Sequence, residues 1–326
     1  MMINILKCHG SSNDFFLIDE WSNSYKFTEE QRVILAQTLC DRDSLLGGDG
    51  ILFYQKSDKA DAKMRIFNSD GSEAEMCGNG LRCVARYALE ALKKDTALIE
   101  TLKENLEVKK LTDIFQGVKT FQVTIKPVRF ELETLPMVYS KKVHRNEKIK
   151  ELSEKLLFTA LSIPNPHIVS LVDNIDEKAI EEMGKIANLD KKIFPRGVNL
   201  NFVKQLGENT IYVQTYERGV GLTNACGTGM SSASLVSCLL GINKIGSIIT
   251  VINRGGMVRC QPKIDSKGNY YVQLIGNATY TYEGQVDFNY DCPLDFVYVN
   301  KKDYAEDTNN YNKLAKHTKN YKAWVI

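Results

Sequence analysis

The chain has 326 residues, a formal net charge of +2 at pH 7 and 43% hydrophobic residues. This length is sufficient for two domains with hydrophobic cores. The net charge is close to zero, and no basic stripe is interleaved with aromatic residues. We therefore expect no nucleic-acid partner. No apolar run approaches the roughly 18 residues of a membrane span, and the first residues lack the pattern of a signal peptide. We therefore expect a cytoplasmic protein with no membrane partner.

The eight cysteines include no Cys-x-x-Cys pair, so the sequence predicts neither a zinc site nor a thioredoxin-like motif. Without an export signal we expect free thiols rather than disulfides. Most of the cysteines fall within apolar patterns that are typical of small buried side chains. Cys77 and Cys226 differ because each precedes a glycine-rich turn at the start of a predicted helix. These two are the candidates for chemistry.

The first part of the chain is expected to contain several strands and one capped helix. Strands are expected over residues 3–7, 15–19, 51–54, 63–68, 98–111 and 120–125. A helix is expected from Thr28 to Cys40, because Thr28 and Gln31 form a capping box. The polar loop between the first two strands carries Asn13, which is either an Asx turn or part of the wall of a site.

Cys77 opens the next predicted helix through Gly78-Asn79-Gly80. An apolar stripe at helical spacing follows, and Arg82 and Arg86 are expected on the opposite face. A cysteine at a helix N-terminus lies at the positive end of the helix dipole, which lowers the thiol pKa from its free value of about 8.5. The bare N–H groups of the turn also form a site for a carboxylate.

After a break at Lys126-Pro127, the second part of the chain repeats this organisation. We expect a charged surface loop with a short helix over residues 141–156, a strand at 167–172, a helix at 175–186, strands from 199 and over 210–217, and hairpins turning near 253–256 and 265–269. Two prolines bracket Asn165. This pattern indicates either a rigid turn or a site residue held in a fixed position. His167 follows, and a histidine at a strand start is more often a hydrogen-bonded core residue than a catalyst.

Cys226 opens a second glycine-led helix that stops at Gly241 and is rich enough in small residues to pack on nearly all sides. Asn68 lies nine residues before Cys77, and Glu217 lies nine residues before Cys226. This spacing predicts two structurally similar halves that arose by duplication. One carboxylate held by both helix ends would have a thiol on each side, an arrangement that suits inversion of an amino acid at its α-carbon.

Five blocks of the sequence resemble the diaminopimelate epimerases, a family of cofactor-free, two-cysteine enzymes. They are Lys7–Phe15, Arg65–Cys83, Asn165-Pro-His, Phe194–Asn199, and Tyr216-Glu-Arg-Gly with Ala225–Gly229. The resemblance implies an α/β (α+β) fold of two pseudo-symmetric domains, each a mostly antiparallel sheet wrapped around a central helix, with the active site in the interdomain cleft. It also implies a cytoplasmic homodimer that interconverts LL- and meso-diaminopimelate, without a cofactor, for lysine and cell-wall synthesis.

The resemblance assigns roles to individual positions. Cys77 and Cys226 match the two catalytic cysteines, with His167 and Glu217 as groups that tune the thiols. Gly78, Asn79, Gly227 and Thr228 match the donors to the carboxylate at the reacting carbon. The residues that match the contacts to the rest of the substrate are Asn13, Asn68, Asn165, Asn199, Glu217 and Arg218. The planar guanidinium of Arg218 suits a second carboxylate, although a surface ion pair is the commoner role of an arginine.

Two departures from the family pattern adjoin substrate-side asparagines. Ser12 and Pro164 stand where the family usually has glycine. A racemase of another amino acid, of the histidine or proline type, is therefore the first alternative. A non-catalytic amino-acid-binding protein or a thiol-redox protein on the same scaffold is the second.

The expected domains are residues 1–127, completed by a returning strand near 279–288, and residues 128–278. Residues 289–326 are charged and asparagine-rich with no clean period, and they exceed the usual length of the family. We expect them to form a C-terminal extension that is partly disordered.

Overall fold

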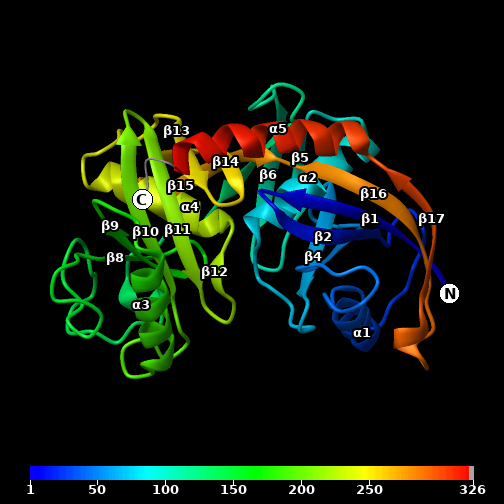
Figure 1. Ribbon diagram of the computed structural model, residues 1–326, viewed down its shortest axis with the longest axis horizontal. Coiled ribbons are helices and arrows are strands. Elements are labelled where there is room, and N and C mark those ends of the chain that lie inside the picture. The colour runs from blue at the N-terminus through cyan, green and yellow to red at the C-terminus, as the bar shows by residue number, and fades with distance from the viewer. Residues whose placement is uncertain (323–326) are drawn as a thin grey trace. The chain divides into compact units, whose positions relative to one another are not determined.

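The computed structural model describes residues 1–322 and divides into two compact units (Figure 1). The first unit comprises residues 1–123 and 276–313, and the second comprises residues 124–275 and the described residues from 314 to 322. Residues 323–326, the end of the predicted extension, lie outside the described residues. Each unit combines helices with a mostly antiparallel sheet, which confirms the predicted fold class.

The sheet of the first unit follows the order β7–β6–β5–β4–β3–β2–β1–β16–β17. Neighbouring strands are antiparallel except in the pairs β2/β3 and β4/β5. The strands are β1 (Met2–Gly10), β2 (Asn13–Asp19), β3 (Gly50–Gln55), β4 (Ala62–Asn68), β5 (Thr96–Glu100), β6 (Asn105–Leu111), β7 (Thr120–Ile125), β16 (Thr279–Asp287) and β17 (Val297–Asp303). In Figure 1, β16 (orange) lies beside β1 (blue), with Ile3 opposite Val286. The chain therefore returns late to the unit in which it began.

Helix α2 (Gly78–Leu92) is the central helix of the first unit, and it contacts six strands, β1 to β6. Its apolar stripe is buried, as the spacing predicts. Cys77 is the N-cap, and Lys93 ends the helix in the left-handed conformation. The other helix of this part of the chain, α1 (Glu29–Leu39), begins after the predicted capping box of Thr28 and Gln31, which is confirmed.

The sequence pattern predicts Arg82 and Arg86 on the face of α2 opposite the apolar stripe, and in the structure both side chains are buried as well. Their exposed fractions are 0% and 1%. Arg82 donates to the carbonyl oxygen of Asn277 at 3.0 Å, and Arg86 donates to that of Ala278 at 2.9 Å and pairs with Asp307. The late return of the chain therefore covers this face and supplies the acceptors that two buried guanidinium groups require.

The second unit has the same kind of sheet around its own helix. Its strands pair in the order β8–β9–β10–β11, and β11 pairs further with β12 and with β13, which continues to β14 and β15. The strands are β8 (Thr159–Ser162), β9 (Pro166–Leu171), β10 (Asn199–Gly207), β11 (Thr210–Glu217), β12 (Gly221–Thr223), β13 (Ile249–Asn253), β14 (Gly256–Ile264) and β15 (Tyr270–Asn277). The pairs β9/β10 and β11/β13 are parallel, and the others are antiparallel. Helix α3 (Glu177–Leu189) packs on β10, β11 and β12.

Helix α4 (Gly227–Leu239) is the central helix of the second unit and contacts β9, β10, β11, β13 and β14. It is buried along Gly227–Ser237, which confirms the prediction from its small residues. Buried serines need partners, and these hydroxyls bond backward along the helix: Ser231 to the carbonyl of Gly227 at 2.9 Å, and Ser234 to that of Met230 at 2.8 Å. The helix thus satisfies these two hydroxyls with its own carbonyl groups.

The two units repeat one local arrangement. In the first, the antiparallel pair β3/β4 ends at Asn68 and leads through a loop to Cys77 and α2. In the second, the antiparallel pair β10/β11 ends at Glu217 and leads to Cys226 and α4. The shared spacing in the sequence therefore corresponds to a shared strand–strand–helix structure.

The short helix expected within residues 141–156 is not formed, and that prediction is wrong. The backbone there is held by bridges instead, and Glu147 and Phe158 exchange two hydrogen bonds of 3.1 and 2.7 Å. Ile149 and Leu152 are buried in the core of the unit with Phe158. The pairing of backbone groups with residues 158–160 removes the donors and acceptors that a helix would use.

The expected partial disorder of residues 289–326 stays a prediction, but the described part of this segment forms regular elements. From residue 293 to residue 322 it forms η2 (Pro293–Asp295), β17 and α5 (Ala305–Lys322). Strand β17 pairs with β16, and its Tyr298 packs against Tyr282 of β16 with the ring centroids 5.8 Å apart. Composition did not indicate α5 because its partners, Arg86 and Gly117, lie far away in the sequence.

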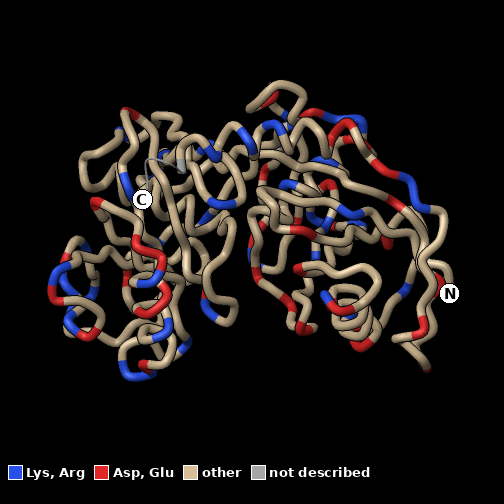
Figure 2. Tube along the Cα trace, in the orientation of Figure 1, with Lys and Arg blue, Asp and Glu red and all other residues tan. Residues whose placement is uncertain are grey.

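Charges of both signs are interspersed along the chain. Figure 2 shows both Lys or Arg and Asp or Glu residues distributed over each unit. Among residues 1–322, no helix is long and apolar enough to cross a membrane.

Candidate active-site residues

Cys77 caps α2 with its own sulfur. The backbone N–H of Gly80 donates to Cys77 Sγ at 3.5 Å, and the thiol is half-buried. A sulfur in this position takes the place of the usual oxygen of an N-cap. The thiol is therefore fixed at the end of the helix where N–H groups lack partners within the helix.

Asn13 lies directly beside this thiol. Its Oδ1 is 3.7 Å from Cys77 Sγ and accepts a hydrogen bond from Asn79 Nδ2 at 3.2 Å. Its Nδ2 donates to Asp49 Oδ2 at 2.5 Å, and the same carboxylate oxygen accepts from the backbone of Asp14 at 2.9 Å. A carboxylate only accepts, so Asp49 fixes which way the Asn13 amide faces. Of the predicted residues, Asn13, Cys77 and Asn79 are brought together here.

Asn68 ends β4, where it is half-buried. Its side chain donates to Ser72 Oγ at 3.0 Å, and its backbone N–H donates to the Ser72 carbonyl at 2.9 Å. Gly78 is the first residue of α2. Both predicted residues thus flank the turn that carries Cys77.

Cys226 repeats this capping in the second unit. The N–H of Gly229 donates to Cys226 Sγ at 3.3 Å, and the Thr228 hydroxyl lies 3.5 Å from the same sulfur. Burial raises the pKa of the Cys226 thiol well above its ordinary value, and the Glu217 carboxylate raises it further. The expectation that the helix terminus lowers this pKa is wrong for Cys226, because burial and the nearby carboxylate outweigh the donors of the helix.

His167 is fully buried, and burial together with the charge of Arg218 lowers its pKa to about 3. The ring is therefore neutral at physiological pH. Asn201 Nδ2 lies 3.1 Å from His167 Nδ1 and also donates to the Ile168 carbonyl at 3.1 Å. Because this amide group is a donor, Nδ1 accepts and the ring proton is on Nε2.

The protonated Nε2 of His167 has two acceptors at 3.0 Å, Asn165 Oδ1 and Thr228 Oγ1. Since the Thr228 oxygen accepts from the ring, its own proton is available to the sulfur of Cys226. The side chains of His167, Thr228 and Cys226 therefore form a chain of hydrogen bonds in which each donor points toward the thiol.

Asn199 and Arg218 are held to each other through the backbone. The Arg218 N–H donates to Asn199 Oδ1 at 2.9 Å, and the guanidinium donates to the Arg196 carbonyl at 3.0 Å. Asn199 Nδ2 approaches His167 Nε2 at 3.4 Å. Because the proton lies on Nε2, Asn199 Nδ2 and His167 Nε2 are both donors and cannot satisfy each other. The hydrogen bond from the Arg218 N–H therefore orients Asn199.

The structure identifies two neighbours that the sequence analysis missed. Asp49 orients Asn13, and Asn201 orients His167. Asp49 stands between Gly48 and Gly50, where the pattern indicates a turn. Asn201 is two residues after Asn199, on the same face of β10, and this alternation of buried amides with apolar residues is the signal that could have revealed it.

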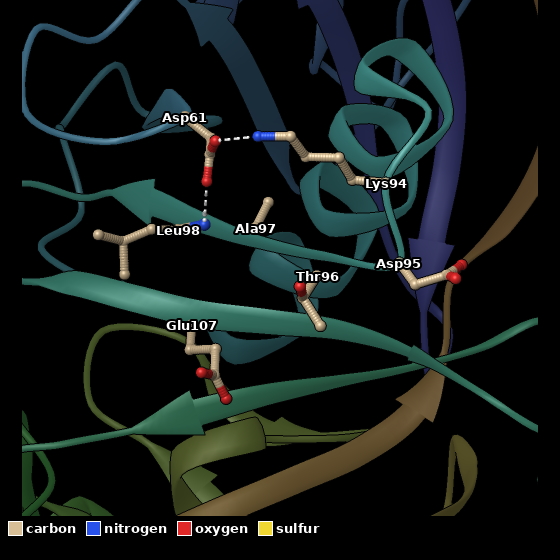
Figure 3. Close-up of a pocket in the computed structure, with 7 residues that line it drawn as sticks. All are labelled: Asp61, Lys94, Asp95, Thr96, Ala97, Leu98 and Glu107. Atoms are coloured by element: carbon tan, nitrogen blue, oxygen red, sulfur yellow. Dashed lines mark hydrogen bonds and ion pairs between the residues drawn. The ribbon is translucent and has the colours of Figure 1, made fainter.

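Two surface pockets of the first unit lie elsewhere. One, of about 470 Å³, is lined by residues of β5 and β6 and by Asp61 and Lys94, which form an ion pair of 2.6 Å (Figure 3). The other, of about 650 Å³, is bordered by β1, β16 and α2. Neither contains a predicted site residue. Within residues 1–322, no cluster of three or more His, Cys, Asp or Glu side chains has the arrangement of a metal site.

Curated relatives match nearly the whole chain. It is 49% identical to the diaminopimelate epimerase of Clostridium acetobutylicum, over 97% of this chain and 95% of that protein. It is 44% identical to the diaminopimelate epimerase of Listeria welshimeri, over 98% of each. Each match leaves at most 3% of the residues of this chain unaligned, so both matches include part of the extension beyond residue 288.

Solved structures share the fold at low sequence identity. A phenazine biosynthesis protein of the PhzF family from Bacillus anthracis matches with a TM-score of 0.65 at 16% identity, over 88% of this chain and 99% of that one. A hydroxyproline epimerase from Agrobacterium vitis matches with a TM-score of 0.62 at 15% identity, over 91% and 95%. These likenesses concern the fold alone.

The model of the family described as diaminopimelate epimerase matches residues 5–120 and 159–281. These two segments include both cysteine-capped helices. Together with the identity to full-length relatives, the match shows that the chain belongs to the diaminopimelate epimerase family.

Proposed function

We propose that this protein interconverts LL- and meso-diaminopimelate without a cofactor, with Cys77 and Cys226 as the acid and the base. The observation that carries the proposal is that each unit has a central helix capped by a cysteine sulfur. Inversion at an α-carbon needs one group to remove a proton from one face and another to deliver a proton to the opposite face. The proposal therefore requires both thiols to act on one substrate carbon.

The helix termini supply what an α-proton abstraction needs most. The α-proton of an amino acid is weakly acidic, so the negative charge that develops must meet donors that are already oriented. The N–H groups at the starts of α2 and α4, at Gly78-Asn79 and Gly227-Thr228, are such donors, and we assign them to the carboxylate of the reacting centre. This stabilisation operates in either direction of the reaction.

We assign the thiol of Cys226 to the chain of hydrogen bonds that starts at His167. Its raised pKa keeps the proton on the sulfur, which suits delivery of a proton to a carbanion. The Thr228 hydroxyl, 3.5 Å away, then stabilises the thiolate that remains. The negative charge of Glu217 destabilises this thiolate, so the sulfur can also take up a proton again and the reaction can run in both directions. His167 and Glu217 thus act as groups that tune the thiol.

The remaining predicted residues are proposed to hold the rest of the substrate. Diaminopimelate has an amino-acid group at each end, so a second carboxylate and a second ammonium need partners. The guanidinium of Arg218 suits the carboxylate. The amides proposed to bind the other polar groups of the substrate are Asn13, Asn68, Asn165 and Asn199, with Glu217 for an ammonium group. We also propose that the protein is cytoplasmic and forms a homodimer. Light scattering on the purified protein tests the homodimer.

Proton NMR of LL-diaminopimelate with the reduced protein in D₂O tests this function. The expected result is loss of the α-proton signal as the meso isomer appears. Loss of the α-proton from proline or histidine, with diaminopimelate unchanged, would instead favour the racemase alternative. No exchange from any of these amino acids would contradict catalysis by this scaffold.

A further inference from the structure

The C-terminal helix α5 contacts the loop that carries Asn13. Tyr311 of α5 is 5% exposed, and its hydroxyl lies 3.3 Å from Ser12 Oγ. Its ring meets His9 edge-on, with the centroids 4.4 Å apart. The Ser12 N–H donates to His9 Nδ1 at 3.3 Å, so Tyr311 adjoins both the side chain and the backbone partner of Ser12.

The backbone of this loop has a conformation that serine rarely adopts. Ser11 and Ser12 have φ of 55° and 65°, in the left-handed region. This region is sterically unfavourable for a residue with a side chain, because its Cβ approaches the following carbonyl oxygen. Bonds from the surrounding protein must therefore maintain it.

Ser11 is held by the core of the first unit. Its N–H donates to Asn277 Oδ1 at 2.8 Å, and its hydroxyl accepts from Arg82 at 3.0 Å. Ser12, next to Asn13, is the residue that Tyr311 contacts. The contact therefore adjoins the amide beside Cys77.

Tyr311 is itself fixed by the start of α5. Asp307 pairs with Arg86 of α2, and Asn310 donates to the carbonyl of Gly117 at 3.1 Å. Arg86 is 1% exposed, so this anchor is buried. A helix held at two points presents the Tyr311 hydroxyl in a defined position.

We propose that Tyr311 is a positioning residue for Asn13, acting through Ser12, and that the C-terminal extension is thereby part of the substrate-binding apparatus. The inference rests on the proposed function, since Asn13 is assigned there to the substrate. The proposal gives a role to Ser12, which departs from the family pattern. It also gives a role to the C-terminal extension, which the family model does not match.

The first test is the kinetics of Tyr311→Phe, which removes one hydroxyl and keeps the ring. A net hydrogen bond of about 0.5–1.5 kcal/mol corresponds to a roughly 2- to 12-fold change. We expect KM for diaminopimelate to rise within that range while the melting temperature changes little. The matched control is Tyr304→Phe, which removes a hydroxyl bonded to Glu283 in the same segment and should leave KM unchanged.

The second test is rescue by glycine. Tyr311→Ala should raise KM further, and adding Ser12→Gly should restore most of the loss, because glycine adopts positive φ without a steric cost. Loss of core packing alone would not respond to Ser12→Gly. An unchanged KM in Tyr311→Phe and Tyr311→Ala, or a failure of Ser12→Gly to restore KM, would overturn the proposal.

A readout that needs no substrate separates this proposal from the proposed function. Asn13 Oδ1 lies 3.7 Å from Cys77 Sγ, so displacement of Asn13 should speed alkylation of Cys77 by iodoacetamide in Tyr311→Ala, with Ser12→Gly reversing the effect. The exposed Cys292 is the internal control, quantified by mass spectrometry. A changed Cys77 rate in a protein without epimerase activity would refute only the function. Equal rates at Cys77 in all variants would refute the positioning.

Discussion

Asn201 Nδ2 donates to His167 Nδ1 across 3.1 Å, and this contact determines which nitrogen of the histidine carries the proton. The amide is oriented from both ends, because it also donates to Ile168 and its Oδ1 accepts from the Thr215 hydroxyl at 2.9 Å. The ring proton therefore lies on Nε2 and faces Thr228. Asn201, a buried residue of β10, thus sets the direction of the hydrogen bonds that His167 makes.

Replacement of Asn201 by Asp should reverse this polarity. A carboxylate accepts where the amide donated, so the ring proton should move to Nδ1 and Thr228 should lose its donor. A buried group left without its partner costs roughly 1–3 kcal/mol, which corresponds to a roughly 5- to 150-fold fall in kcat/KM. Nitrogen-15 NMR of the His167 ring gives the tautomer independently of activity. An Nδ1–H tautomer in the wild-type protein would contradict the assignment.

Asp49 should matter for substrate binding although the sequence pattern indicates only a turn. In Asp49→Ala the Asn13 amide loses the acceptor that orients it. A hydrogen bond to a charged group contributes about 1.5–3 kcal/mol, so kcat/KM should fall roughly 10- to 150-fold. Asp43→Ala, an exposed change in the same loop, is the control. Equal kinetics of the two variants would show that Asn13 needs no such support.

The stability of the protein should fall as the pH falls below 6.5. Burial lowers the pKa of His9 to about 4 and that of His167 to about 3 from the ordinary 6.5. The unfolded chain therefore binds protons that the folded chain does not, and acid favours unfolding. The two histidines together should reduce the free energy of unfolding by about 3 kcal/mol between pH 6.5 and pH 5. Burial lowers the pKa of His144 as well, which acts in the same direction.

Urea unfolding at several pH values measures this effect. The variant His9→Asn keeps an acceptor for Ser12 but does not titrate in this range, so it should lose about half of the pH dependence. A free energy of unfolding that stays constant between pH 6.5 and pH 5 would contradict neutral, buried histidines.

The sequence predicted those features that depend on local patterns. The capping box of Thr28 and the two helices that begin after Cys77 and Cys226 are local, and the structure has them. The fold class and the family are confirmed as well. The roles assigned to the individual site residues stay predictions, although the structure brings several of them within hydrogen-bond distance in each unit.

What the sequence did not reveal depends on distant partners. Arg86 is buried because Ala278 and Asp307 reach it from nearly 200 residues or more along the chain. The ion pair with Asp307 also ties α5 to α2. The pKa of Cys226 is raised because the fold buries the thiol beside Glu217, which no local rule for a helix terminus includes. Tertiary contacts decided each of these cases.

The most direct test of the two-cysteine account compares Cys77→Ala and Cys226→Ala with the wild-type protein, by the rate of LL- to meso-diaminopimelate conversion. Each change removes one positioned acid–base group, so each should slow conversion by at least roughly 10²-fold. The controls are Cys292→Ala in the first unit and Cys238→Ala in the second, and circular dichroism verifies the fold. The account predicts loss in both test variants and near-normal rates in both controls. A near-normal rate in either Cys77→Ala or Cys226→Ala would contradict it.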